Sequence, residues 1–324
     1  MSDPAGAGNF FKKWLWPFYA YGCGSMGKGV EAALFGVLTA ALFALTVWLL
    51  SRSFISLITA KKSRKAKKYV EKTARANSAY GALARLELRR FLTDPLYLMN
   101  SILGVIFVFA AGIAALIYAP VLRELVAGIK GAYGFALLPK YNTYFIAIVT
   151  FIICLVSSMS AISSAAVSLE GNRIWIPLVS PVPAEQVILA KLTPHMLFSG
   201  VSGLFTALCI CLAGGTDLFT TLLVPLTVVA FAALTGTFGL CLEAHRPKLN
   251  WTDETAAIKN NLNVLFATLG AWLVLAVLSG ASIPLCIFFP QAILLVLPFA
   301  FLLFAGLAYL FFRLAVKGWE KLEA

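Results

Sequence analysis

The chain alternates between long apolar stretches that carry no charge and shorter polar ones. The charge-free intervals are 32–51, 95–122, 141–169, 192–216, 218–242 and 260–312. About 20 apolar residues cross the hydrocarbon of a bilayer, and a span must be a helix because lipid offers no partner for free backbone groups. The last interval is too long for one crossing and is expected to break near Gly280, Pro284 and Pro290. The pattern therefore predicts seven spans in an all-α integral membrane protein.

One long polar segment, residues 52–94, separates the first span from the other six. Its first part is a basic run and its second part has the period of an amphipathic helix that Pro95 ends. The predicted apolar face contains Tyr80, Ala84, Leu88, Phe91 and Leu92. Arg85 and Arg89 lie on the opposite face, Arg90 follows them, and Glu87 intrudes at the edge of the apolar face. We expect an interfacial helix on the inner leaflet; the alternative is a cytosolic extension of the next span.

These boundaries give three regions. Residues 1–60 are expected to hold an extracytoplasmic N-terminus and the first span, and residues 61–97 a basic linker with the interfacial helix. Residues 98–324 are expected to form a six-helix transmembrane bundle. The interfacial helix is expected to precede this bundle, and a further helix is expected in the cytoplasmic loop after its second span.

Composition and charge agree with a membrane protein and orient it. The chain is 60% hydrophobic and 12% charged, whereas a soluble domain is about a quarter charged. Twelve basic residues lie between Arg52 and Arg90, which places that segment in the cytoplasm by the positive-inside rule. The N-terminus is then outside and the C-terminus inside the cytoplasmic membrane. The net charge of +12 needs no nucleic-acid partner, because anionic lipid accounts for it.

Three features of the sequence argue against catalytic or ion-coupling chemistry on this chain. The six cysteines and two histidines lack metal-ligand spacing. The run GCGSMGKG, residues 22–29, mimics phosphate-binding signatures, but no strand precedes it. Lys191, His195 and Glu243 are expected near the ends of spans, where they reach water, so that ion coupling is disfavoured. No enzyme domain, cofactor site or metal site is expected on this chain.

The segment 168–192, SLEGNRIWIPLVSPVPAEQVILAKL, is more organised than a linker between spans requires. Glu170-Gly171 begins a turn, Trp175 offers an interfacial anchor, and three prolines prevent regular helix in the middle. Pro183-Ala184-Glu185 has the pattern of a helix start. We expect Val187, Ile188, Leu189 and Leu192 to seat this helix on the bundle, and Glu185, Gln186 and Lys191 to face water or a partner. The segment therefore favours docking over a plain linker.

The run SAAVSLEGNRIWIPLVSPVPAEQVILAKL, residues 164–192, resembles a loop of bacterial ABC transporter permeases of the type-two exporter class. The run EAHRPKLNWTDETAAIKNNL, residues 243–262, is similar to a second loop of the same subgroup. An interfacial helix followed by six spans also matches that layout.

The resemblance implies that the interfacial helix is the elbow of the bundle and that the first loop docks on a separate ATP-binding subunit through a cytoplasmic coupling helix. The residues carried over are Glu170, Gly171, Arg173, Trp175, Pro181, Glu185 and Lys191. The second loop would shape the same face through Lys248, Trp251, Thr252 and Glu254. On the interfacial helix the residues are Arg85, Glu87, Arg89 and Arg90. ATP and magnesium would be held by the partner subunit.

The chain departs from the doubled, twelve-span permeases of this subgroup and resembles their C-terminal half. A second permease half or a homodimer mate is therefore an expected partner, together with membrane lipid. Two other functions stay open: a secondary transporter or channel that needs no nucleotide, and a non-transporting membrane scaffold.

Overall fold

The computed structural model describes residue 12 and residues 16–59, 78–121, 123–124, 141–160 and 162–323. Most of the predicted N-terminal region before the first span, the basic run within 61–77 and most of the connection 120–140 lie outside the described residues. Every regular element in the described ranges is helical, which confirms the all-α fold. The chain divides into two units, Met1–Ala74 and Arg75–Ala324.

The first unit contains two packed helices, α2 (Trp16–Ser25) and α3 (Gly29–Thr59). Gly22 and Gly24 lie within α2, and Gly27 turns the chain at a φ of 84° before α3 begins. The run 22–29, which mimics a phosphate-binding signature, is thus divided between the end of α2 and a tight turn. The long apolar part of α3 is the first candidate span.

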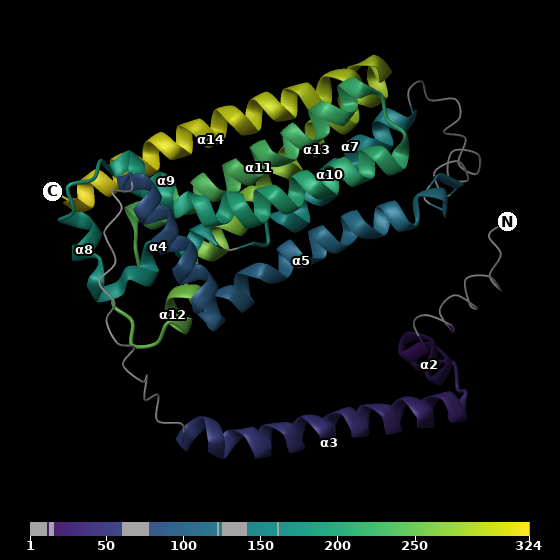
Figure 1. Cartoon of the computed structure of the whole chain (residues 1–324). Helices are drawn as coiled ribbons and strands as arrows, with labels where there is room; N and C mark the ends of the chain where they lie inside the picture. Colours follow the sequence, from purple (N-terminus) through teal and green to yellow (C-terminus); the bar gives the residue numbers. More distant parts are fainter. Residues whose placement is uncertain are drawn as a thin grey trace. The chain divides into compact units, whose positions relative to one another are not determined.

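The second unit is a helical bundle in which α11 and α14 lie side by side and α10 packs between α5 and α11 (Figure 1). A π-helical turn, η4, joins α9 and α10 into one long helix. Its main helices are α4 (Ala79–Thr93), α5 (Pro95–Ile117), α7 (Tyr141–Ser157), α9 (Ala184–His195), η4 (Met196–Gly200), α10 (Val201–Gly214), α11 (Leu218–His245), α13 (Leu262–Phe288) and α14 (Ile293–Glu323).

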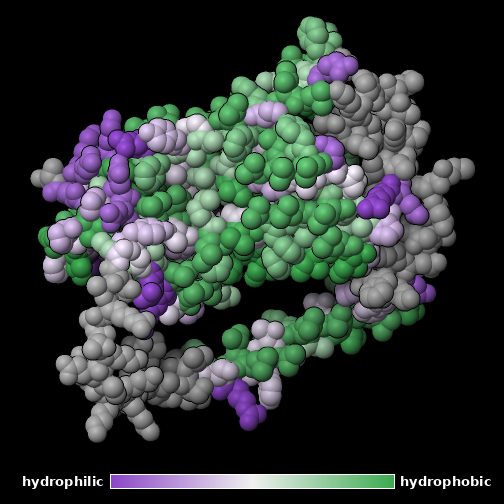
Figure 2. Space-filling view, turned by 45° about the horizontal axis from the view of Figure 1, so that its top comes forward, coloured by the Kyte–Doolittle hydropathy of each residue, from purple (hydrophilic) through white to green (hydrophobic). Residues whose placement is uncertain are grey.

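Six helices in the described residues are long and apolar enough to cross a membrane. They are Gly29–Phe54, Pro95–Ile117, Ala184–Gly214, Leu218–His245, Thr255–Cys286 and Ile293–Glu323. The chain therefore has the character of a multi-pass membrane protein. Hydrophobic residues cover the middle of the bundle, and hydrophilic ones gather at the end that carries α4, α8 and α9 (Figure 2). We call this end the polar end.

Two predicted spans differ from the helices found. The span expected over 141–169 ends at Ser157, and two short 3-10 turns, η2 (Ser163–Ala165) and η3 (Ser168–Arg173), follow it. Serine side chains compete for backbone hydrogen bonds, and the run from Ser157 to Ser168 contains six of them, so the helix is not sustained. The long interval 260–312 does divide into two helices, and the break lies at Pro290, between α13 and α14, rather than at Gly280 or Pro284, because α13 continues through both to Phe288.

Capping residues define the starts of two helices at the polar end. Oδ1 of Asp94 accepts hydrogen bonds from the N–H groups of Leu96 (3.0 Å) and Tyr97 (3.1 Å), and Pro95 occupies the first turn of α5. Ser78 caps α4 in the same manner through the N–H of Gly81. α4 and α5 are thus separate helices with a break at Asp94.

Candidate functional site

The polar end is built mainly from the two loops singled out in the sequence. The first loop contains η3, the short helix α8 (Trp175–Leu178) and the start of α9. The second loop contains α12 (Thr255–Ile258) and leads into α13. The predicted helix start is confirmed, since α9 begins at Ala184 directly after Pro183.

A buried cluster of ion pairs joins the first loop to α4 and α9. Nζ of Lys191 lies 2.6 Å from a carboxylate oxygen of Glu170 and 2.7 Å from one of Glu87. Glu170 also pairs with Arg90 at 3.0 Å, and Arg90 donates a hydrogen bond to the carbonyl of Leu169. Three separate elements therefore meet around one lysine.

The position of Lys191 corrects its predicted role. It was expected on the polar side of its helix, facing water or a partner, but it is only 2% exposed. It also donates to the carbonyl of Ala166 at 3.2 Å and lies 5.9 Å from the ring of Trp319. Burying an ammonium group is tolerated when it is paired and hydrogen-bonded, and Glu87 and Glu170 supply the pairs. This also explains why Glu87 interrupts the apolar face of α4.

The charges of the cluster reinforce one another. Burial acts to raise the pKa of Glu170, but the neighbouring charges of Lys191 and Arg90 outweigh it and leave that pKa below its ordinary value. Burial conversely acts to lower the pKa of Arg90, and the negative charges of Glu170 and Glu87 raise it. Glu170 and Arg90 are therefore both ionised at neutral pH.

A second buried network centres on Glu243, which is fully buried at the end of α11. One carboxylate oxygen accepts a hydrogen bond from the backbone N–H of Ser168 at 2.6 Å. The other accepts from the side-chain amides of Asn261 and Asn263, both at 2.8 Å. The prediction that Lys191, His195 and Glu243 reach water is therefore wrong for all three, since each is at most 2% exposed. The bundle provides partners that allow the burial.

The second loop closes over the first through Ser168 and Gly171. Nε1 of Trp251 donates to the carbonyl of Ser168 at 2.7 Å. The backbone N–H of Lys248 donates to the hydroxyl of Ser168 at 2.9 Å. Gly171 has a φ of 52°, and a Cβ there would lie 2.8 Å from the indole of Trp251. Only glycine suits both the conformation and the contact.

The remaining predicted residues of the second loop, Thr252 and Glu254, are exposed. Burial and the negative charge of the nearby Asp94 raise the pKa of Glu254 above its ordinary value. The structure brings Lys248 and Trp251 to the first loop and leaves Thr252 and Glu254 on the surface.

The middle of the first loop, in contrast, faces outward. Trp175 is 61% exposed and Val179 71%, and Ile176 is also exposed. Arg173 and Pro181 are exposed on either side of them, and Glu185 forms a surface ion pair with Arg313 at 2.7 Å. We call Arg173, Trp175, Ile176, Val179, Pro181 and Glu185 the outer face of the loop.

The helix α4, which was expected to lie at the membrane interface, is amphipathic. Arg85 and Arg89 are exposed, as expected, and Phe91 is fully buried. Leu92, which was expected on the apolar face, is 49% exposed. Glu87 and Arg90 pair with the cluster around Lys191.

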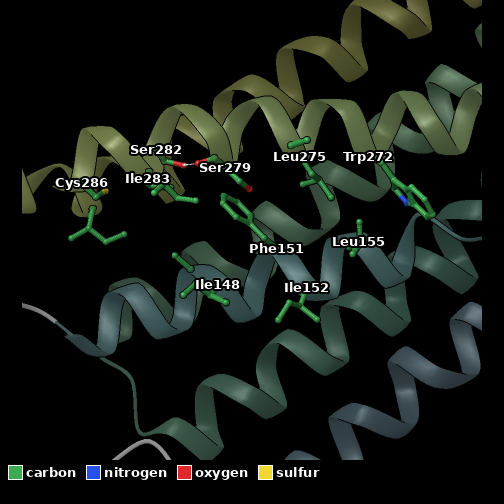
Figure 3. Close-up of a pocket in the computed structure, with 14 residues that line it drawn as sticks. Ile148, Phe151, Ile152, Leu155, Trp272, Leu275, Ser279, Ser282, Ile283 and Cys286 are labelled. Carbon is green, nitrogen blue, oxygen red and sulfur yellow. Dashed lines mark hydrogen bonds between the residues drawn. The ribbon is translucent and has the colours of Figure 1, made fainter. Parts of the chain in front are cut away.

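An apolar groove of about 790 Å³ lies between α7 and α13, away from the polar loops (Figure 3). Ile148, Phe151 and Leu155 point into it from α7, and Trp272, Leu275 and Ile283 from α13. The Nε1 of Trp272 donates to Ser158 at 2.9 Å at one end. Its lining suits hydrocarbon and contains no charged group.

Sequence reasoning missed Ser168, Asn261 and Asn263. Their signal was present: Asn261 and Asn263 stand at the start of an apolar interval and Ser168 at the end of another, and Glu243 supplies the partner for all three. No group of histidine, cysteine or carboxylate side chains suited to a metal occurs in the described ranges. No protein-family model matches the chain, and no curated protein matches its sequence.

Proposed function

We propose that the chain is the membrane-spanning subunit of an ATP-driven exporter of the ABC class, the type-two permease that its loops resemble. ATP and magnesium would bind to a separate cytoplasmic subunit, and transport would require a second permease half or a second copy. The chain itself would carry no catalytic residue.

The observation that supports the proposal is an outward-facing apolar segment joined to a base of buried ion pairs. Large apolar side chains exposed at a polar surface favour a protein contact, and Trp175, Ile176 and Val179 form such a group. The base is the buried cluster around Lys191, which connects the loop to α4 and α9. A force applied to the outer face would thus act on several helices together.

In this proposal α8 and the start of α9 form the coupling helix, and α4 is the elbow on the inner leaflet. The polar end then lies in the cytoplasm of the cytoplasmic membrane, with the C-terminus of α14 beside it and the N-terminus outside. Arg85 and Arg89 would contact anionic lipid headgroups from the exposed side of α4.

A second candidate function gains support from one observation. Ion-coupled transporters keep ionisable groups inside the membrane, and Glu243 and His195 are buried in the bundle rather than at its surface. A secondary transporter would work in vesicles without an ATP-binding subunit. The carboxylate of Glu243, however, already accepts three hydrogen bonds at the polar end.

The test is co-expression with an ATP-binding subunit of the ABC class, followed by co-purification and ATPase assays in nanodiscs. Replacing Trp175 and Val179 by serine is expected to abolish co-purification while the bundle stays folded. Leu218→Ser is the matched control, because Leu218 is 75% exposed at the start of α11, outside the two loops. Wild-type capture of the ATPase by the double variant would refute docking through the outer face.

A further inference from the structure

The apolar groove between α7 and α13 has a buried floor and exposed walls (Figure 3). Three helices supply the floor, through the buried side chains of Ala147 on α7, Leu275 on α13 and Val296 on α14. The walls carry the large side chains of Ile148 and Ile283, both more than half exposed. The volume of about 790 Å³ lies within the range of pockets that hold one small molecule, roughly 300–1,000 Å³.

Small side chains on α13 leave room for the groove. The lining positions 272, 275, 279, 282 and 286 alternate in steps of three and four, so they share one face of the helix. Ala276 and Ser279 lie in the middle of this lining, between the larger Trp272 and Ile283. A large side chain at either middle position would therefore fill the groove.

The groove runs lengthwise along a helix that is long and apolar enough to cross a membrane. From Trp272 to Cys286 it follows α13 for about 20 Å, at a rise of 1.5 Å per residue. Its Cys286 end lies next to Phe288, where α13 ends remote from the polar end. Its other end is bounded by the hydrogen bond from Trp272 to Ser158. Half of a bilayer's hydrocarbon is about 15 Å deep, so the groove is long enough to cross one leaflet.

The chemistry of the lining selects the occupant. None of the described residues that line the groove is charged, and the hydroxyl of Ser282 donates to the carbonyl of Leu278 in its own helix. An ordered water needs two to four polar partners, which apolar walls do not offer. A peptide segment would leave its backbone groups without partners against the same walls. The lining therefore suits a hydrocarbon chain.

The groove offers a hydrocarbon chain more contacts than the rest of α13 does. Leu273 and Val277 are also exposed on α13, but they lie outside the groove. A chain inside the groove contacts side chains of α7, α13 and α14 together. Lipid tails are as apolar as these side chains, so the number of van der Waals contacts decides where a chain stays. The groove is therefore the preferred position.

We propose that the groove binds one acyl chain of a phospholipid whose headgroup lies at the membrane face remote from the polar end. The chain enters at Cys286, lies between the walls formed by Ile148 and Ile283, and ends at Trp272. The headgroup stays outside the groove, because the lining has no charged partner for it. The inference goes beyond the proposed function, since this binding requires neither ATP nor another subunit.

Photo-crosslinking of the full-length chain in nanodiscs tests the site. The probe is a phosphatidylcholine with a diazirine in the middle of one acyl chain, and peptide mass spectrometry locates the adducts. Phe151 and Ser279 should be labelled about tenfold more than Leu273 and Val277, because about ten additional carbon contacts suffice for that ratio. Equal labelling of the two pairs would show ordinary lipid contact only and would overturn the proposal.

Filling the groove separates this site from general lipid contact. Ala276→Phe should lower the labelling of Phe151 by about tenfold and leave that of Leu273 unchanged. Val277→Phe is the matched control, since it adds a ring at the next position, outside the groove. Ser279→Phe fills the same space if Ala276→Phe fails to fold. Unchanged labelling of Phe151 in the folded filling variant would overturn the proposal, and docking of an ATP-binding subunit would be unaffected.

Discussion

The ends and the middle of the segment 168–192 are adjacent in sequence and lie in opposite environments. Its ends, Glu170, Gly171 and Lys191, are held by ion pairs and by the ring of Trp251. Its middle, from Arg173 to Glu185, exposes a tryptophan and a valine. The charged ends are inside and the apolar middle is outside, which inverts the usual arrangement. Substitutions in the ion pairs around Lys191, which we call the anchor, and substitutions in the outer face are expected to change stability differently. Only in the anchor does removing one side chain leave a buried charge without its partner.

The largest effect is expected from Lys191→Met. The change leaves Glu87 and Glu170 without their shared cation and should lower the free energy of unfolding by about 3–5 kcal/mol. Thermal unfolding in detergent measures it, with the exposed Lys317→Met as the control. Adding Glu87→Gln and Glu170→Gln should restore part of the loss. An unfolding temperature equal to that of the control would show that Lys191 is not an anchor.

Glu243→Ala is expected to come next. It removes the acceptor of the Ser168 N–H and of two asparagine amides, which would cost about 3 kcal/mol. The exposed Glu320→Ala on α14 is the control. Limited proteolysis should additionally cut the second loop in the Glu243 variant. If proteolysis left that loop intact, Glu243 would not be what joins the two loops.

Gly171→Ala tests the backbone turn between anchor and outer face. A φ of 52° together with the contact to Trp251 should make the change cost about 2 kcal/mol of stability. Gly306→Ala, which has open space around it, is the control. The fluorescence of Trp251 should shift in the first variant alone. Equal stability of the two variants would contradict the tight packing.

Acid should loosen the anchor by a smaller amount, since Lys191 keeps Glu87 when Glu170 is protonated. The folded-state pKa of Glu170 is lowered, so its stabilisation is full above its ordinary value of 4.5 and is lost as the pH falls through the folded pKa. Glu170→Gln should flatten this dependence between about pH 5 and pH 3 in thermal unfolding. An unaltered profile in that variant would assign the acid response to another group.

The smallest effect is expected at the surface pair Glu185–Arg313. Both side chains are about half exposed, so a double-mutant cycle should give a coupling energy of about 0–1 kcal/mol that salt reduces. Binding is the property to follow here: reversal of Glu185 should weaken capture of the ATP-binding subunit without changing the unfolding temperature. A coupling energy as large as the loss expected for Lys191→Met would contradict the difference between the buried ends and the exposed middle of the segment.

Several features follow from sequence alone because they depend on local chemistry. Apolar length predicted helices that span a membrane, since backbone groups in lipid must be satisfied within the segment. Pro95 and Pro183 marked the starts of α5 and α9, because proline fixes φ and lacks an N–H. The positive φ of Gly171 agrees with the turn predicted at Glu170-Gly171. Docking on an ATP-binding subunit and the direction of transport stay predictions.

Other features were decided by contacts between residues far apart in the chain. Periodicity placed Lys191 on a polar side and Glu87 on a flawed apolar face, and neither pattern reveals that the two side chains meet across 104 positions. The same holds for Glu243 with Ser168, Asn261 and Asn263. An ionisable residue near a span end has two low-energy solutions, water or a buried partner. The sequence determines that burying these ionisable groups costs free energy, because their charge depends only on the residue type. Only the tertiary structure supplies the partners that offset this cost.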